Sequence, residues 1–302
     1  MESMWEAESY PALQDYYLVC YFAFAFPVAR FLLNCLFYQK LARLLILPKG
    51  EKGLKNGVKE AGAKKICKFT ESAWKLTYYL STEICVVWIT YKEPWFTDTS
   101  TFWHGWPHQT LKYSLKLFYT FQCGFYIYSV AALLVWETRR KDHNVMMSHH
   151  IVTIGLIAYS YITGSFRAGT VILALHDVSD IFMELAKLFK YCRSELGASI
   201  CFGLFVLSWV LLRLIYFPFW VIWSTSYKVI PYIDLSKANI SLLYYVCNTL
   251  LITLLVIHIY WWVLISRMVI RQLRNCGKVG EDVRSGLSLS SSSSSSSTCL
   301  NL

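Results

Sequence analysis

Charged residues are scarce in this chain. They make up 16% of its 302 residues, whereas hydrophobic residues make up 56%. The apolar residues fall in runs long enough to cross the hydrocarbon core of a bilayer, which excludes a soluble single domain. Because a membrane span must satisfy its own backbone hydrogen bonds, the composition predicts an all-α, polytopic membrane protein.

Three further absences narrow the class of protein to which this chain can belong. The ten cysteines show no CxxC or other paired spacing, which argues against a disulfide framework and a zinc site. No basic flank precedes the first apolar run, so residues 15–37 are expected to be a retained span rather than a cleaved signal peptide. The sequence lacks an array of basic and aromatic residues, so nucleic acid is not expected as a partner.

Seven membrane-spanning helices are predicted from the apolar runs. They are placed at 15–37, 72–91, 115–136, 148–164, 166–190, 200–224 and 240–266. An even span count is the alternative, because the fourth and fifth runs are divided only at Gly164-Ser165. The loop 92–114 is rich in aromatic residues, which is typical of a belt at the membrane interface.

Loop charges predict the orientation. The segment 38–71 holds nine Lys and Arg residues, whereas the stretch 1–14 holds Glu2, Glu6 and Glu8. The positive-inside rule makes 38–71 a basic cytosolic loop and 1–14 a lumenal N-terminus. The serine-rich tail 271–302 cannot bury a core and is expected to be disordered in the cytosol. The net charge of +10 then reflects topology and attraction to anionic membrane lipids.

Polar side chains concentrate in the fourth and fifth predicted spans. His149 and His150 are adjacent, while His176, Asp180 and Glu184 are spaced i, i+4, i+8, so they share one helix face, with Asp177 beside them. Ionisable groups in a membrane are costly unless they pair or line a polar cavity. Helix packing alone would more often use Ser, Thr or Asn, so these six residues indicate a functional site.

The two groups of residues are predicted to meet at one depth. At ~1.5 Å per residue, His150 lies roughly 21 Å from the turn at Gly164, and Asp180 lies roughly 20 Å from Arg167. Both distances place the site in the cytosolic half of the membrane.

A neutral imidazole beside a carboxylate can serve as a general base or as a nucleophile. Metal binding is the competing interpretation. Adjacent histidines point about 100° apart on a helix and chelate poorly, and the series of several spaced histidine boxes expected of desaturases and hydroxylases is absent. The sequence therefore predicts acid–base or nucleophilic chemistry without a metal.

The same region resembles the longevity-assurance signature of ceramide synthases, within the wider TLC-domain family. The matching residues are His149-His150, Ser160-Tyr161, Arg167, Gly169, His176-Asp177, Asp180, Glu184 and Ala186-Lys187. The resemblance implies a TLC domain over 65–270, with its active-site region at 148–190. It also implies that the last six helices form a bundle or barrel around a central lipid cavity. The loop 38–71 leaves no room for a homeobox-like insert, which favours the plant or fungal type.

The resemblance implies N-acylation of a sphingoid base, sphinganine or phytosphingosine, with a fatty acyl-CoA to give ceramide or dihydroceramide. The expected location is the endoplasmic reticulum membrane, among membrane lipids, with a lumenal N-terminus and a cytosolic C-terminus. Acyl-CoA is a substrate, and no cofactor is expected. The sequence leaves a homo- or hetero-oligomer open.

Roles for single residues also follow from the resemblance. The expected catalytic residues are His149, His150, Asp177 and Asp180, and the expected supporting residues are Tyr161, Arg167, His176 and Glu184. A histidine either deprotonates the amine for direct attack or first accepts the acyl group, with His149 favoured as acceptor. The alternative function is a non-catalytic lipid-binding or translocation-associated TLC protein. A G-protein-coupled receptor is disfavoured, because the acidic cluster lies at the cytosolic end.

Overall fold

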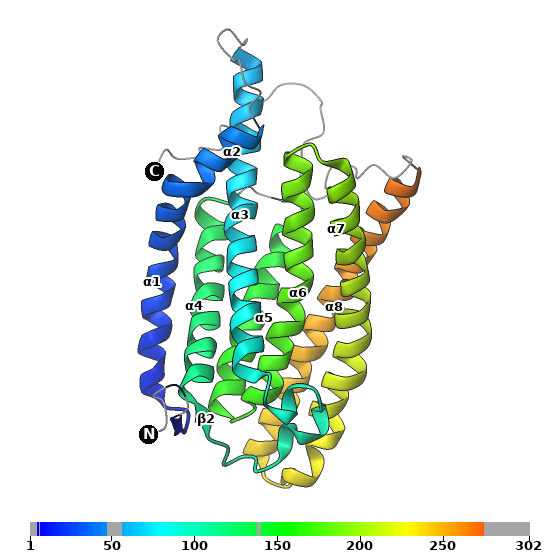
Figure 1. The fold of residues 1–302 in the computed structure, drawn as a ribbon. Coiled ribbons are helices and arrows are strands. Elements are labelled where there is room, and N and C mark those ends of the chain that lie inside the picture. The colour runs from blue at the N-terminus through cyan, green and yellow to red at the C-terminus, as the bar shows by residue number, and fades with distance from the viewer. Residues whose placement is uncertain (1–4, 6, 47–55, 138–139, 275–302) are drawn as a thin grey trace.

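The computed structural model describes residues 5, 7–46, 56–137 and 140–274. Of the predicted segments, most of the tail 271–302 and the centre of the loop 38–71 lie outside these residues. Within the described ranges, seven long helical segments run between the two ends of the molecule (Figure 1).

The helices have the following bounds. The first segment comprises α1 (Tyr16–Leu33), the π-helical η3 (Asn34–Tyr38) and α2 (Gln39–Ile46). It is followed by α3 (Asn56–Thr90), α4 (Tyr113–Val135), α5 (His143–Ile162) and α6 (Phe166–Tyr191). Then come α7 (Glu195–Ser208) with its π-helical continuations η6 (Trp209–Ile222) and η7 (Ser224–Lys228), and finally α8 (Ala238–Arg274).

Each predicted span falls on one of these segments. By length and composition, five of them could cross a membrane in the part of the chain that the structure describes. The two segments outside this group are α3 and α6. The helix α6 carries the predicted polar stripe, which is the face formed by His176, Asp180 and Glu184 with Asp177 beside them. An all-α membrane protein is therefore confirmed, whereas the count of seven spans stays a prediction.

The structure differs from the predicted basic loop 38–71. Residues 39–46 are helical, and α3 begins at Asn56, well before the predicted start of its span at 72. Lys is a good helix former, and its charge can extend beyond the membrane surface while the helix continues. The basic residues of this segment therefore did not mark the end of the helix.

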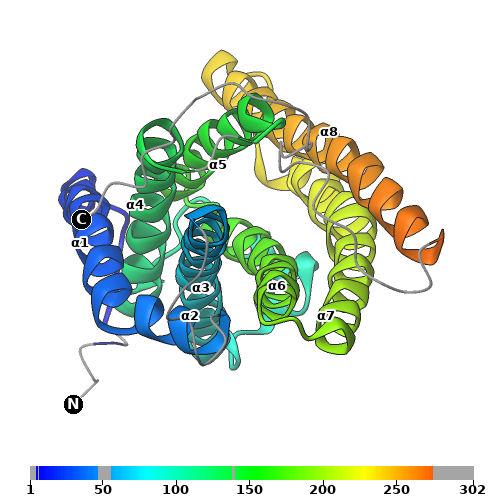
Figure 2. The same ribbon diagram turned by 90° about the horizontal axis from the view of Figure 1, so that it is seen from above.

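The helices α3 to α8 surround a common centre (Figure 2). Going around this ring, α4 contacts α5, α5 contacts α8, α8 contacts η6, α7 contacts α6, α6 contacts α3, and α3 contacts α4. The first segment lies outside the ring, against α4. This arrangement agrees with a barrel made of the last six long segments.

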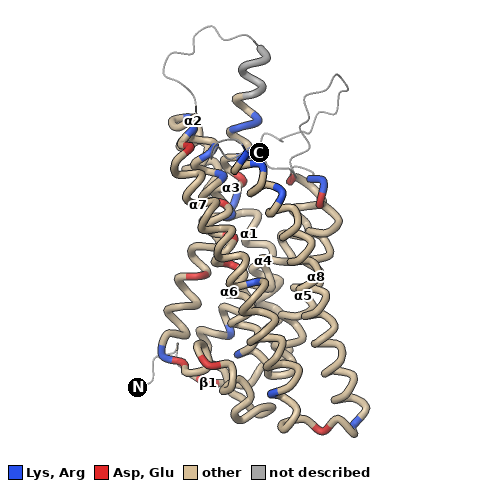
Figure 3. The backbone as a smooth tube through the Cα atoms, turned by 90° about the vertical axis from the view of Figure 1, so that its right-hand side faces the viewer, with Lys and Arg blue, Asp and Glu red and all other residues tan. Residues whose placement is uncertain are grey.

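The two ends of the barrel differ in the residues that they carry. Lys and Arg gather at the end that holds α2 and the start of the described α3, which we call the basic end (Figure 3). Ion pairs there join Lys75 to Glu71 (3.2 Å) and Glu137 (2.8 Å), and Arg140 to Glu71 (3.1 Å). The charge pattern agrees with the predicted orientation, which stays a prediction.

The opposite end, which we call the aromatic end, is covered by the segment 91–112. This segment contains the 3-10 turns η4 (Pro94–Phe96) and η5 (Thr99–Trp103), and its strand β2 (Leu111–Lys112) pairs with β1 (Glu8–Ser9). Trp103 is buried and donates to Ser224 Oγ at 3.0 Å, and Trp106 donates to the Thr163 carbonyl at 2.9 Å. Both tryptophans are thus held by hydrogen bonds within the protein at this end of the barrel, and the interfacial belt stays a prediction.

The first segment, which lies outside the barrel, contacts it at a glycine of α4. A Cβ atom at Gly124 would lie 2.7 Å from Phe22 Cβ, 3.1 Å from Ala23 N and 3.1 Å from Val19 O. Only hydrogen fits between these two backbones. Because Val19 and Phe26 are the buried residues of α1, this close approach is central to its attachment.

We expect Gly124→Ala to lower the melting temperature of the detergent-solubilised protein, measured by tryptophan fluorescence. Overpacking costs about 1–3 kcal/mol, and here the atoms in the way are mostly backbone. Gly203→Ala is the matched control, because its new Cβ would meet nothing within 4 Å. Equal melting temperatures for the two variants would contradict this account of the contact.

Candidate active site

His149 and His150 lie in the second turn of α5 and are both buried, at 9% and 8% exposure. The His149 ring lies 5.5 Å from His150 and 5.1 Å from Trp261, measured between centroids. The Nδ1 atoms of both histidines are buried and have no hydrogen-bond partner among the described residues. Unpaired buried nitrogens are costly, which is typical of atoms reserved for a substrate or a proton.

His176 of α6 lies near this pair but is held by other groups. Its Nδ1 is 2.5 Å from the Ile172 carbonyl, and its Nε2 is 3.0 Å from Nε2 of His258 in α8. His176 and His258 are both buried. A second histidine pair therefore lies beside the first, and the His149 and His258 rings are 6.3 Å apart.

Asp180 has an arginine as its partner. Arg213 of η6 donates from Nη2 to Asp180 Oδ2 at 2.8 Å and to the His176 carbonyl at 2.7 Å. Its guanidinium also lies over the Trp209 ring, 4.2 Å from the centroid. Asp180 lines the same cavity as His149, but it compensates a buried cation there rather than binding an imidazole.

Asp177 points away from the histidines. Its Oδ2 accepts hydrogen bonds from Gln122 of α4 (2.9 Å) and Thr82 of α3 (3.1 Å), and Tyr78 donates to Gln122 in turn. Successive residues of a helix differ by about 100° in direction, so His176 and Asp177 face different neighbours. In the structure Asp177 joins helices, and the prediction that it shares the stripe is wrong.

Glu184 continues the stripe toward the basic end. It lines the same cavity as Asp180 and forms an ion pair with Lys187 at 2.7 Å.

Tyr161 and Arg167 do not reach the histidines. Tyr161 donates to Asp15 at 2.5 Å, and Arg167 donates to the carbonyls of Thr101 (3.2 Å) and His104 (3.1 Å). Both residues fix connections at the aromatic end: along their helices, Tyr161 lies roughly 17–18 Å from His149 and His150, and Arg167 lies roughly 14 Å from His176. The structure thus gives them a supporting role in the fold, at a distance from the candidate site.

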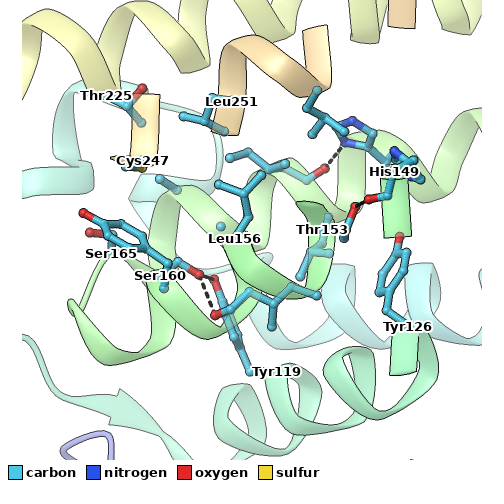
Figure 4. Close-up of a pocket in the computed structure, with 18 of the residues that line it drawn as sticks. Tyr119, Tyr126, His149, Thr153, Leu156, Ser160, Ser165, Thr225, Cys247 and Leu251 are labelled. Carbon is cyan, nitrogen blue, oxygen red and sulfur yellow. Dashed lines mark hydrogen bonds between the residues drawn. The ribbon is translucent and has the colours of Figure 1, made fainter. Parts of the chain in front are cut away.

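Two cavities meet at His149. One, of about 880 Å³, is lined by charged residues, among them Asp180, Glu184 and Arg213, together with aromatic and methionine side chains, and it reaches the basic end; we call it the polar cavity. The other, of about 620 Å³, is mainly apolar and extends toward the aromatic end. In Figure 4, His149 and Tyr126 lie at one end of the apolar cavity, and Ser165, Thr225 and Cys247 lie at the other. Of the residues that the structure describes, only His149 and Tyr126 line both cavities.

Sequence reasoning missed His258 and Arg213, although a signal was present. His258 is the only histidine or charged residue between Lys237 and Arg267, and Arg213 is the only charged residue between Glu195 and Lys228. An ionisable residue inside an apolar run is a candidate functional residue by itself. Across the described ranges, no group of three or more His, Cys, Asp or Glu side chains is placed to hold a metal ion.

The sequence was compared with known families and proteins. The TLC domain model matches residues 68–267. Ceramide synthase LOH2 of Arabidopsis thaliana is 54% identical over 89% of this chain and 90% of its own length. Ceramide synthase LOH1 of the same plant is 52% identical over 93% of both chains, and human ceramide synthase 5 is 36% identical over 78% of this chain and 58% of its own. The chain therefore belongs to the TLC-domain family, as a homologue of the plant ceramide synthases.

Proposed function

We propose that this protein is a ceramide synthase, an acyltransferase that joins the acyl group of a fatty acyl-CoA to the amine of a sphingoid base. Relatives with that name cover nearly the whole chain. The observation that carries the proposal is the position of His149 between a polar and an apolar cavity. A reaction between a water-soluble thioester head and two long apolar chains needs such a junction.

The cavities fit the substrates in kind. The apolar cavity offers Leu156, Leu251 and Leu254 to a hydrocarbon chain. The polar cavity reaches the end of the barrel where basic residues gather, and these residues would attract the phosphates of CoA. In this proposal the protein lies in the endoplasmic reticulum membrane with its basic end in the cytosol and its N-terminus in the lumen.

The chemistry begins with a protonated amine, which must lose a proton before it can attack a thioester. The amine nitrogen then bonds to the acyl carbon, the carbon–sulfur bond breaks, and CoA leaves as a thiolate that takes up a proton. A buried site with neutral imidazoles supplies the base and excludes water, which would hydrolyse the thioester.

An acyl-histidine intermediate is the route we favour. His149 Nδ1 is buried without a hydrogen-bond partner in the described structure, and the ring lines both cavities. In this route the imidazole nitrogen attacks the thioester and CoA leaves, after which the amine attacks the acyl-imidazole and frees the ring. The direct route uses His149 or His150 only as a base.

A non-catalytic lipid-binding protein would keep these cavities but would not need reactive histidines. We expect purified protein to form ceramide from sphinganine and acyl-CoA, as measured by mass spectrometry. His149→Ala should lower the rate at least roughly a hundredfold, because a base or nucleophile is lost. His108→Ala is the control, because His108 is an exposed histidine at the other end of the barrel. Full activity of His149→Ala would favour the lipid-binding alternative.

The acyl intermediate can be tested without the second substrate. Incubated with acyl-CoA alone, the wild-type protein should gain the mass of one acyl group and release one CoA, as read by intact-mass spectrometry. His149→Ala should gain nothing, and added sphinganine should remove the adduct from the wild type. Rapid synthesis without any adduct in a quenched single turnover would favour direct attack.

The ion pair between buried Arg213 and partly buried Asp180 predicts a non-additive effect on stability. Either Asp180→Asn or Arg213→Gln leaves one charge without its partner, and the cost of breaking a fully buried pair, about 3–5 kcal/mol, is the upper limit here. The double variant removes both charges and should melt above either single variant. Its synthesis should nevertheless remain at least roughly a hundredfold below wild type if the pair orients the site. Additive losses in melting temperature would show that the two charges act independently.

A further inference from the structure

His258 has no role in the mechanism described so far, yet its surroundings are unusual. It is fully buried, at 0% exposure, on an otherwise uncharged stretch of α8. Its Nε2 is bonded to His176, while its Nδ1 is buried and has no partner in the described part of the chain. A nitrogen that is kept dry and unpaired inside a membrane protein points to a function.

The hydrogen bonds assign the protons on both rings. The Ile172 carbonyl can only accept, so Nδ1 of His176 carries a hydrogen. Arg213, a permanent cation, is bonded to the backbone carbonyl of His176, and it disfavours a second positive charge on that ring. His176 is then neutral with a lone pair on Nε2, so the hydrogen between the rings belongs to His258.

The free nitrogen of His258 is therefore a lone-pair acceptor. The groups that face it are His149 from α5, His176 from α6, and Arg213, Trp209 and Phe217 from η6. None of these groups hydrogen-bonds to its Nδ1. His258 lines neither cavity, but its ring centroid lies 6.3 Å from that of His149, so a proton released beside His149 could reach Nδ1 through one water.

We propose that His258 takes the proton that the sphingoid ammonium releases before it attacks. This inference rests on the proposed function. The N–H bond of the ammonium breaks, its electron pair stays on the amine nitrogen, and the proton binds Nδ1 of His258. In the acyl-histidine route, the ring hydrogen of His149 leaves with CoA as the thiol, and the amine's second proton, released after attack, replaces it on that ring. The proton stored on His258 returns to solvent when product departs.

The decisive variant is His258→Gln. Its side-chain amide can still donate to Nε2 of His176, but it has no nitrogen that accepts a proton. We expect kcat at neutral pH to fall at least roughly a hundredfold, with KM for acyl-CoA little changed, because the interaction is used only on the way to the transition state. Raising the pH should recover activity toward wild type, because more sphinganine then arrives already deprotonated. His108→Gln is the matched control and should follow the wild type at every pH.

Each possible outcome of this experiment either supports or overturns the proton-acceptor role of His258. A His258→Gln variant with near wild-type kcat, or with a deficit that pH does not change, would overturn the proton-acceptor role. Folding is followed by size-exclusion chromatography, and the smaller His258→Asn is used if the Gln variant aggregates. Failure of both to fold would assign His258 to packing and also overturn the inference. A wild type without ceramide formation would instead overturn the proposed function, and this inference with it.

Discussion

The guanidinium of Arg213 is a buried cation on a stretch of helix that is otherwise uncharged, and the arrangement of the site depends on the groups that compensate this charge. A buried charge is tolerated only when its hydrogen bonds are satisfied and a counter-charge is near. Arg213 obtains both from α6, through the Asp180 carboxylate and the His176 carbonyl, and it lies on the Trp209 ring. Its helix is π-helical at this point, a geometry often found at functional sites. These contacts fix α6 against η6.

The same cation also acts on the neighbouring His176. Positive charge on His176 would lie close to Arg213, whereas neutral rings leave lone pairs available to accept a proton. Asp177, one residue further along α6, belongs to a different network with Gln122 and Thr82. Adjacent residues of one motif thus serve two purposes: His176 faces the cavity, and Asp177 holds three helices together.

The sequence was sufficient to predict the helices, since the length of an apolar run determines whether it spans a bilayer. Helical periodicity also predicted that His176, Asp180 and Glu184 share a face. It could not predict which neighbour that face meets, because this depends on the packing of all the helices. The predicted depth places Asp180 beside the histidines, whereas its partner is Arg213, and the resemblance makes Tyr161 a supporting residue of the site, whereas it bonds to Asp15. The rule that an ionisable residue in an apolar span is a functional candidate applies equally to His258.

The apolar cavity has the candidate reactive residue His149 at one end and no such residue at the other. His149 marks the point where an acyl carbonyl would react, while Thr225 and Cys247 lie at the far end and Trp103 contributes to the wall. Under the proposed function, the length of the cavity between His149 and this far end would limit the length of the acyl chain that can bind. Side chains that never approach the reacting atoms would then decide how many carbons the fatty chain contains. Selectivity for chain length and the ability to form the amide bond could therefore evolve independently, at opposite ends of a single cavity.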